Sequence, residues 1–337
     1  MQNRTYGDLF NLIQSLAGVN SFTTEESADI SRFINRRFFT AFNKTNIWAR
    51  YVVPSEQRKL AVIKVEGADS ESYDGYYIKN GESSNAVNST YADADVFVKS
   101  DNKSYVLFKN SSNLWSLGIN DTGFTYTPIT GITTFTTAIP DSAYRQDSTD
   151  VDDYDKPSGV KLWKGTGLAG STSKINLIVT DVSTLLYESL DFPIFDNSLA
   201  IGNTNIINDF IRIHRNQSFL NDSSLEYDFF VDFNGANVLN VKNTDDFHVT
   251  YKKKFVKFTT SSDFGTSTEE VPEEFFQYIA HSAYADFLRM DGQTQKALVE
   301  EQNAEEALNL QLERSDIIFN INTLKKRFST YINNQSR

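Results

Sequence analysis

The chain has 337 residues, a formal net charge of −12, 39% hydrophobic residues and 13% aromatic residues. This composition is typical of a folded globular protein and excludes a disordered one, and the length suffices for one large core or two smaller ones. Cysteine is absent, which excludes disulfides, thiolate nucleophiles and sulfur ligands for zinc.

Neither a membrane span nor a signal peptide is expected. The sequence has no apolar run of roughly 18 residues, and residues 1–10 lack the basic and apolar regions of a signal peptide. The three histidines, His214, His248 and His281, are far apart and have no i,i+4 partner. We therefore expect a protein made in a cytoplasm, with no histidine metal site and no Ser-His-Asp relay.

Both ends of the chain have helical patterns. Thr5 and Asp8 have the spacing of a capping box before a first amphipathic helix, which Gly18 ends. Thr23 or Thr24 caps a second helix, in which apolar residues repeat at helical spacing from Ile30 to Phe42. That apolar stripe needs a partner, and we expect it at the other end of the chain.

The C-terminal region predicts two further helices and a tail. The first begins at Pro272 and ends at Asp291-Gly292, and the second covers Thr294–Arg314. The segment from Ile317 to Arg337 is basic and aromatic and has no acidic residue. In an acidic chain such a segment indicates attachment to another protein or to a polyanion.

The middle of the chain predicts β structure. Segments rich in β-branched and aromatic residues alternate with Asn, Asp, Ser and Gly turns, and Asn234-Gly235 predicts a hairpin. The fold class is therefore α+β: a helical bundle formed by the N- and C-terminal helices, a central antiparallel β-sandwich-like domain and an inserted small β module. The acidic stretch 141–157 is expected to be the seam where that module ends. The predicted domains are 1–56 with 272–314 (helical), 57–150 (inserted module), 151–271 (central β) and 315–337 (basic tail).

Charge is segregated between the helical segments. The stretch from Ile30 to Ser55 has five basic residues and no acidic one, whereas the last predicted helix is rich in glutamate. One interpretation is that these faces pair within the chain; the alternative is contact with an acidic neighbouring subunit. The inter-subunit candidates are Arg32, Arg36, Arg37, Glu300, Glu301 and Glu305.

Two motifs resemble ligand-binding sites, but each lacks the flanking residues or elements that such a site requires. Residues 165–170 read GTGLAG, a literal G-x-G-x-x-G, but a strand-like segment follows where a dinucleotide site needs a helix, so we expect a turn. Asp150, Asp152, Asp153 and Asp155 have the density of a calcium site but lack the glycine and glutamate of an EF-hand, so we expect a solvated linker. The sequence therefore predicts no cofactor and no metal.

No motif indicates an enzyme. Paired carboxylates could serve glycoside hydrolysis, but nothing singles out two of the 44 acidic residues. Tyr76, Tyr77 and Trp115 could form an exposed aromatic surface that stacks on sugars, or they could lie in the core. We expect a protein that is not an enzyme.

The order of parts is similar to that of a known viral family. The segments concerned are 48–54 (WARYVVP), 212–215 (RIHR), 226–232 (EYDFFVD), 249–255 (VTYKKKF) and, most strongly, 271–293, continuing through Lys296 and Glu300. Together with the N-terminal helices they resemble tailed-bacteriophage head-to-tail adaptor proteins, also called connector or neck proteins, over about half of the chain. The module around Gly75 to Leu117 is absent from the minimal adaptor plan and resembles small β repeats of phage structural proteins.

The resemblance implies a structural virion protein at the junction of capsid and tail, assembled in the bacterial cytoplasm. It implies a ring, usually of twelve copies, whose partners are the portal protein and tail or further neck proteins, with no membrane involved. Double-stranded DNA would pass through the ring during ejection, and the acidity of the chain would repel its phosphates. The tail would dock on the portal through Leu324, Lys325, Lys326, Arg327, Phe328, Tyr331 and Ile332. The alternative is a receptor- or carbohydrate-binding virion tail protein that uses Tyr76, Tyr77 and Trp115.

Overall fold

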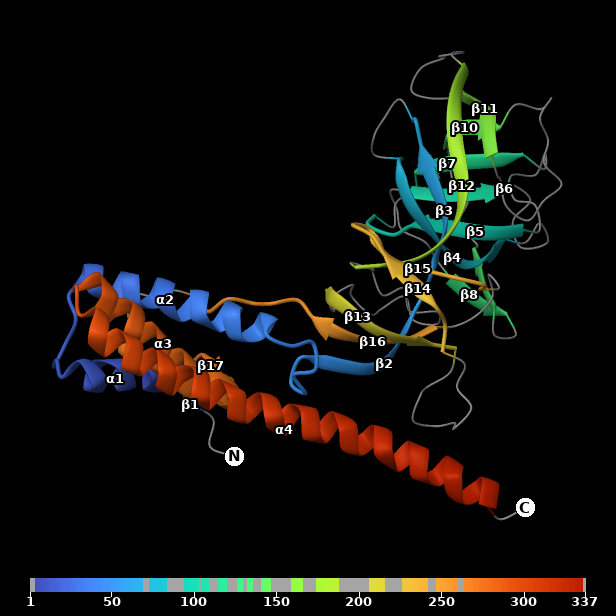
Figure 1. Cartoon of the computed structure of the whole chain (residues 1–337). Helices are drawn as coiled ribbons and strands as arrows, with labels where there is room; N and C mark the ends of the chain where they lie inside the picture. The colour runs from blue at the N-terminus through green and yellow to red at the C-terminus, as the bar shows by residue number, and fades with distance from the viewer. Residues whose placement is uncertain are drawn as a thin grey trace. The chain divides into compact units, whose positions relative to one another are not determined.

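The structure, a computed structural model, describes residues 4–68, 73–83, 94–102, 105–109, 114–119, 126–129, 132–135, 141–146, 159–165, 174–187, 206–215, 226–241, 247–259 and 264–335. Within these ranges it contains four α-helices and antiparallel sheets, so the chain is α+β (Figure 1). Two compact units are formed: the helical unit, Met1–Val52 with Lys252–Arg337, and the β unit, Val53–Tyr251.

The helical unit is built from both ends of the chain. Its helices are α1 (Tyr6–Ala17), α2 (Thr24–Asn43), α3 (Glu273–Met290) and α4 (Thr294–Gln335), with the short strands β1 (Arg4–Thr5) and β17 (Glu270–Val271) paired and a 3₁₀ turn at Phe264–Thr266. Capping boxes at Thr5 with Asp8 and at Thr23 with Glu26 satisfy the N-terminal amides of α1 and α2. Gly18 ends α1 in the left-handed region, with φ of 68°.

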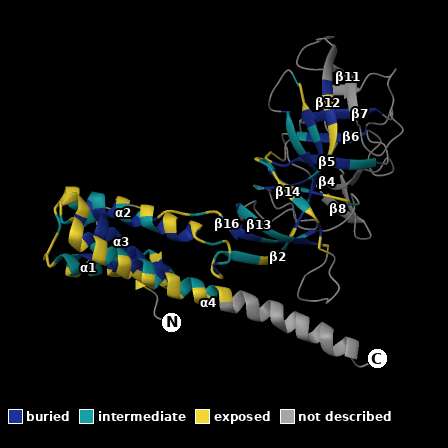
Figure 2. Cartoon of the chain, viewed as in Figure 1, coloured by how far each residue is buried: buried dark blue, intermediate teal, exposed yellow. Residues whose placement is uncertain are grey.

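The apolar stripes of these helices meet in one core. Ile34 and Phe38 of α2, Phe275 and Ile279 of α3 and Leu308 of α4 are buried in it. Trp48 closes this core: its ring lies edge-on to Phe275 at 4.8 Å, and its indole nitrogen donates to the carbonyl of Ala41 at 3.1 Å. Figure 2 shows buried residues on the side of α2 toward α3 and exposed residues on its other side. The predicted partnership between the two ends of the chain is thus confirmed.

Lys252 ties the chain to the C-terminal end of α2. It is 1% exposed, and its ammonium donates to the carbonyls of Phe42 at 2.8 Å and Thr45 at 3.0 Å and to Asn46 Oδ1 at 3.3 Å. The same ammonium lies 3.8 Å from the centre of the Phe42 ring. A cation at this position complements the negative end of the helix dipole and accounts for carbonyls that lack helical partners.

The β unit contains a sheet that closes on itself. Its strands are β3 (Ala61–Glu66), β4 (Gly75–Ser83), β5 (Ala94–Lys99), β6 (Tyr105–Lys109), β7 (Trp115–Ile119), β10 (Asp141–Gln146), β11 (Gly159–Gly165) and β12 (Lys174–Leu186). Among the described strands, these eight pair antiparallel in that order, and β12 pairs back with β3. A closed circuit satisfies the backbone groups that an open sheet leaves at its edges.

Side strands extend this circuit. They are β8 (Tyr126–Ile129) with β9 (Ile132–Phe135), the latter parallel to β4, and β14 (Phe229–Val231) with β15 (Gly235–Val238), the latter beside β12. A separate three-stranded sheet has the order β13 (Ile207–His214), β16 (Phe247–Lys253), β2 (Val52–Arg58). The boundary between the two units falls inside β2 and β16.

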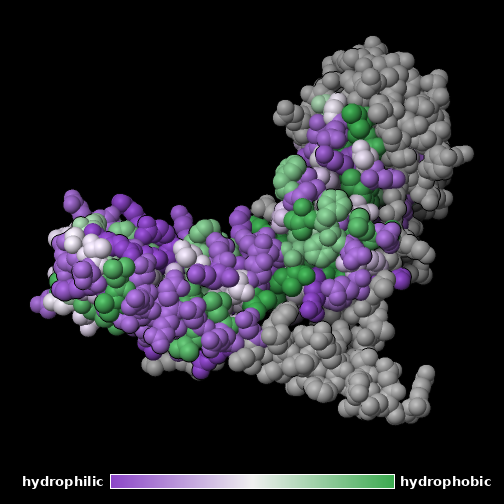
Figure 3. All heavy atoms as spheres, in the orientation of Figure 1, coloured by the Kyte–Doolittle hydropathy of each residue, from purple (hydrophilic) through white to green (hydrophobic). Residues whose placement is uncertain are grey.

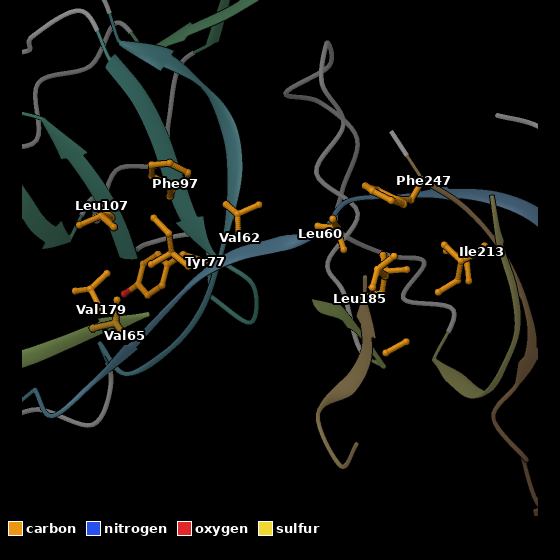
Figure 4. Packing of buried hydrophobic residues seen from close by; sticks show 14 of the residues in the cluster. Leu60, Val62, Val65, Tyr77, Phe97, Leu107, Val179, Leu185, Ile213 and Phe247 are labelled. Atoms are coloured by element: carbon orange, nitrogen blue, oxygen red, sulfur yellow. The ribbon is translucent and has the colours of Figure 1, made fainter. Parts of the chain in front are cut away.

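Side chains from several strands of the circuit converge inside it. Figure 4 shows Tyr77 beside Phe97, Leu107, Val65 and Val179, which come from β4, β5, β6, β3 and β12. The neighbouring residues on these strands, such as Ile78, Val98 and Val106, form a second buried cluster on the other face. Burial of both faces explains why these strands are continuous apolar runs and not alternating ones.

The domain boundaries differ from those predicted. The strands predicted as an inserted module (57–150) and those of the central β region (151–271) share one sheet, and the expected seam at 141–157 begins with β10, which pairs with β7 on one side and β11 on the other. Closing the circuit requires strands from both segments, so neither is a separate unit. The helical unit contains the predicted helical domain except residues 53–56.

The hairpin predicted at Asn234-Gly235 is confirmed, with a different role for the glycine. Asp232 accepts hydrogen bonds from the amides of Asn234 and Gly235 at 2.8 and 3.0 Å, which holds the turn between β14 and β15. Gly235 does not have a positive φ. A Cβ at this residue would lie 2.0 Å from the carbonyl oxygen of Leu185 on β12, so the glycine is required for close approach of two backbones.

Gly235→Ala is therefore expected to destabilise the β unit by roughly 1–3 kcal/mol, because the added methyl meets backbone that cannot move without disturbing β12. Urea unfolding of the variant checks this. Leu239→Ala, an exposed residue just after the same hairpin, is the control and should change stability by less than about 0.5 kcal/mol. An unchanged midpoint for Gly235→Ala would contradict the close contact.

Candidate functional site

A group of charged residues joins three helices of the helical unit. Asp286 of α3 is 5% exposed and accepts two hydrogen bonds from Arg37 of α2, at 2.7 Å from Nε and 2.6 Å from Nη2. Arg36 lies 2.6 Å from the same carboxylate, and Arg289 lies 3.5 Å from it. Glu301 of α4 completes the group by pairing with Arg37 at 3.4 Å and with Arg289. We call these five residues the Asp286 cluster.

The three arginines of the cluster keep its two carboxylates charged. Burial by itself would raise the pKa of Asp286, but hydrogen bonds from Arg37 and Arg36 outweigh it, so the pKa of this carboxyl is below its usual value. The hydrogen bond from Arg289 lowers the pKa of Glu301. Both carboxylates are thus held charged, and each charge is paired by arginine forks that suit carboxylate geometry.

Two more pairs connect α4 to its neighbours. Glu300 lies 2.6 Å from Nδ1 of His281 on α3, and Glu305 lies 3.6 Å from the ammonium of Lys44 at the end of α2. The interpretation that the basic side of α2 pairs with glutamates of the C-terminal helices is thus confirmed for Arg37 with Glu301 and for Lys44 with Glu305. Asp286 and Arg289 were missed in the sequence because a single charged residue within an apolar helix has no local signal.

The six inter-subunit candidates therefore differ in their surroundings. Arg37, Glu300, Glu301 and Glu305 have partners on other helices of the same chain. Among the described residues Arg32 pairs only with Asp29, one turn earlier on the surface of α2, and its side chain is 76% exposed. Arg36 reaches Asp286 while its side chain remains 62% exposed. Arg32 and Arg36 thus have the most surface to offer to another molecule.

The predicted exposed aromatic surface is wrong for two of its three residues. Tyr77 and Trp115 are both fully buried inside the closed sheet, and Tyr77 lies among the core residues of Figure 4. Tyr76 points to the other face, is partly buried and has the ammonium of Lys64 5.6 Å from its ring centre. Successive strand residues point to opposite faces, so Tyr76 and Tyr77 could not share one surface.

The basic tail is part of a helix. The structure continues α4 without interruption from Thr294 to Gln335, whereas the sequence predicted a helix end at Arg314. No glycine or proline occurs in 315–335, so nothing in the sequence breaks the helix. The predicted portal-binding residues, from Leu324 to Ile332, lie on its last turns, and their side chains lie outside the described ones.

The two ligand-like motifs have different outcomes. Gly165 ends β11 and Lys174 begins β12, and these strands pair antiparallel, whereas residues 166–170 of the GTGLAG motif lie outside the described residues. Asp150, Asp152, Asp153 and Asp155 lie outside the described residues. In the part of the chain that the structure describes, no three His, Asp or Glu side chains are grouped as metal ligands would be. None of the described helices is both long and apolar enough to cross a membrane.

Comparison of the chain with protein-family models, with curated proteins and with solved structures gives no significant match. What the chain does must therefore be inferred from its own residues. Those residues form a helical unit held together by charge pairs, with long α4 carrying a basic segment near its end, and a β unit inserted between the two halves of that helical unit.

Proposed function

We propose that the chain is a structural virion protein, a head-to-tail adaptor whose ring joins the portal to the tail and lines the DNA conduit of a tailed bacteriophage. In this proposal α1–α4 form a bundle that packs in the ring. The β unit, in which a closed circuit of strands takes the place of the predicted sandwich, faces the tail. The protein acts mechanically and not as an enzyme, and it resides at the junction of capsid and tail.

The observation that carries the proposal is α4. It has 42 residues against 18 in α3, the helix it packs on, so it extends well beyond that partner (Figure 1). At 1.5 Å per residue its length is roughly 63 Å. Its last part contains Lys325, Lys326 and Arg327 and no acidic residue from Ile317 onward. A long helix with a rigidly attached base and a basic end suits a segment that docks on a partner protein such as the portal.

Two further features support this role. The net charge of −12 repels the phosphates of DNA, which suits a conduit through which DNA slides. The ion pairs of the Asp286 cluster join α2, α3 and α4, so these helices form a rigid unit whose outer faces can contact other proteins. The alternative of a carbohydrate-binding protein loses its basis because Tyr77 and Trp115 are buried.

The test is the copy number of the chain in purified phage particles, measured by quantitative mass spectrometry against the portal protein of the same particles. We expect about as many copies as portal subunits, because a ring bound to the portal repeats its symmetry. A count of a few copies per particle would place the chain at a tail tip or fibre. Absence from the particles would overturn the proposal.

A companion variant tests α4. A chain ending after Arg314 keeps the described core contacts of α4, including Leu308 and Leu312, and removes the basic segment. Particles assembled with it are expected to contain portal without this chain. Full incorporation of the shortened chain would show that the basic segment does not attach it.

A further inference from the structure

The outward side of α2 carries a basic stripe with one aromatic residue. Arg32, Arg36, Phe39 and Asn43 are exposed and follow at spacings of four, three and four residues, so they lie on one side of the helix. Buried Ile30, Ile34 and Ala41 lie on the opposite side. Phe39 is 51% exposed, and the ring of Phe255 holds it in an edge-on contact at 5.2 Å. We call these four residues the α2 stripe.

The outward side of α4 carries an acidic stripe with two apolar residues. Val299, Glu306, Leu310 and Glu313 are exposed and follow at spacings of seven, four and three residues. Buried Ala304 and Leu308 lie on the opposite side. Val299 and Leu310 are 55% and 57% exposed. From Leu298 to Glu313 the helix has five glutamates and no basic residue. We call Val299, Glu306, Leu310 and Glu313 the α4 stripe.

The α2 stripe is complementary in charge to the α4 stripe, and neither stripe is complementary to a second copy of itself. At 1.5 Å per residue, they span roughly 17 and 21 Å, and each places an apolar side chain among charges of one sign. Pairing two α2 stripes would oppose arginine to arginine, and pairing two α4 stripes would oppose glutamate to glutamate. Pairing α2 with α4 opposes opposite charges and covers Phe39 and Leu310, both of which are more than half exposed. The face of the helical unit drawn in Figure 3 is mostly hydrophilic.

We propose that the α2 stripe of one copy packs against the α4 stripe of a second copy. The contact uses a different surface on each of its two sides, so a pair of copies keeps one free α2 stripe and one free α4 stripe, and the association continues until a ring closes or a filament grows. For closure into a ring this inference rests on the proposed function, whereas the pairwise contact does not. Phe39 serves as the anchor, because Phe255 already fixes its ring before binding.

Sedimentation of the purified full chain tests the contact. The wild type is expected to associate with rising concentration, and Phe39→Asp and Leu310→Asp are each expected to weaken association by at least roughly 30-fold. An equimolar mixture of the two variants is the decisive sample. Each variant retains one intact stripe, so the mixture should form a one-to-one pair that cannot grow further.

Phe233→Asp is the matched control. Phe233 is 89% exposed, more than either target, but lies in the β unit outside both stripes, so this variant should associate as the wild type does. A wild type that remains monomeric up to roughly 0.5 mM would overturn the proposal. So would a mixture that stays monomeric although the wild type associates, or a single variant that associates normally.

Cross-linking gives a second measurement that does not depend on charge. The chain has no cysteine, so each introduced thiol is unique. Isotopically labelled chains carry Phe39→Cys, and unlabelled chains carry either Leu310→Cys or Val299→Cys. On mild oxidation we expect disulfides between labelled and unlabelled chains, because a disulfide forms only where the two Cα atoms approach to about 4.4–6.8 Å. Phe233→Cys with Leu310→Cys should not. Disulfides mainly between identical variants would contradict the proposal.

These outcomes are separable from those of the particle experiment. A chain equal in number to the portal in particles, but lacking the α2–α4 contact in solution and in cross-linking, would keep the adaptor role and overturn this contact. A chain absent from particles that still forms the one-to-one pair would keep the contact and overturn the adaptor role.

Discussion

Replacing Asp286 by alanine is expected to lower the free energy of unfolding of the helical unit by about 3–5 kcal/mol. The substitution leaves Arg37, whose side chain is 14% exposed, without the carboxylate that accepts two of its hydrogen bonds, and it also removes partners of Arg36 and Arg289. Glu301, 3.4 Å from Arg37, remains, but the loss of the closer carboxylate from a buried cation costs far more than the loss of a surface pair. Hydrogen exchange of α2 and α3 peptides in increasing urea measures this, with peptides of the β unit as the internal reference.

Asp29→Ala provides the matched control. Asp29 also pairs with an arginine, at 2.9 Å, but on the surface of α2, so its loss should cost less than about 1 kcal/mol. Asp286→Asn separates charge from shape: it keeps one acceptor oxygen and should lie between the alanine variant and the wild type. Equal stability of Asp286→Ala and Asp29→Ala would show that the Asp286 cluster does not hold the helices together.

Removal of the Lys252 ammonium is the second large effect that we expect. Lys252→Ala should destabilise the helical unit by about 3 kcal/mol, because charged hydrogen bonds to the carbonyls of Phe42 and Thr45 are lost in a buried environment. Lys252→Met keeps most of the aliphatic stem over the Phe42 ring and should lose less. Thermal unfolding monitored by far-ultraviolet circular dichroism, which follows mainly the helices, checks both variants.

Lys257→Ala is the control for Lys252. Lys257 lies five residues later on the same segment and is exposed, so its removal should change stability by no more than about 0.5 kcal/mol. If Lys252→Ala unfolded at the temperature of Lys257→Ala, the hydrogen bonds at the end of α2 would be without consequence for stability.

The helices could be predicted from the sequence because their signals are local. The capping residues Thr5 and Thr23 act within one turn, and Gly18 ends α1 by its own backbone conformation. The predicted end of α4 at Arg314 is wrong, although the sequence carries the signal that corrects it: no glycine or proline occurs between Arg314 and Gln335. The β structure of the middle of the chain was also predicted from local pattern, because segments rich in β-branched and aromatic residues alternate there with turn residues.

The closure of the sheet could not be predicted, since it depends on pairs far apart in sequence. Val179 pairs with Val65, and no local pattern in either strand encodes that partner. The incorrect prediction that Tyr77 and Trp115 are exposed has a related cause. Both faces of these strands are apolar, so the alternation of residues along a strand does not show which face points into the closed sheet. The basic face of α2 and the acidic face of α4 could be predicted from the sequence. That Arg36 and Arg37 form ion pairs within the chain could not be predicted, because their partner Asp286 lies on α3, far away in sequence.

The order of the units along the chain has a mechanical consequence. Residues 53–251 form one unit between two segments that both belong to the helical unit, and the boundary lies in β2 and β16, neighbours in one sheet. Tension applied between the two chain ends therefore acts first across the helical unit. The inserted unit is shielded from that tension as long as the helices stay joined. In an assembly that transmits force along its axis, the strength of the joint would thus be set by α1–α4 and not by the larger β unit.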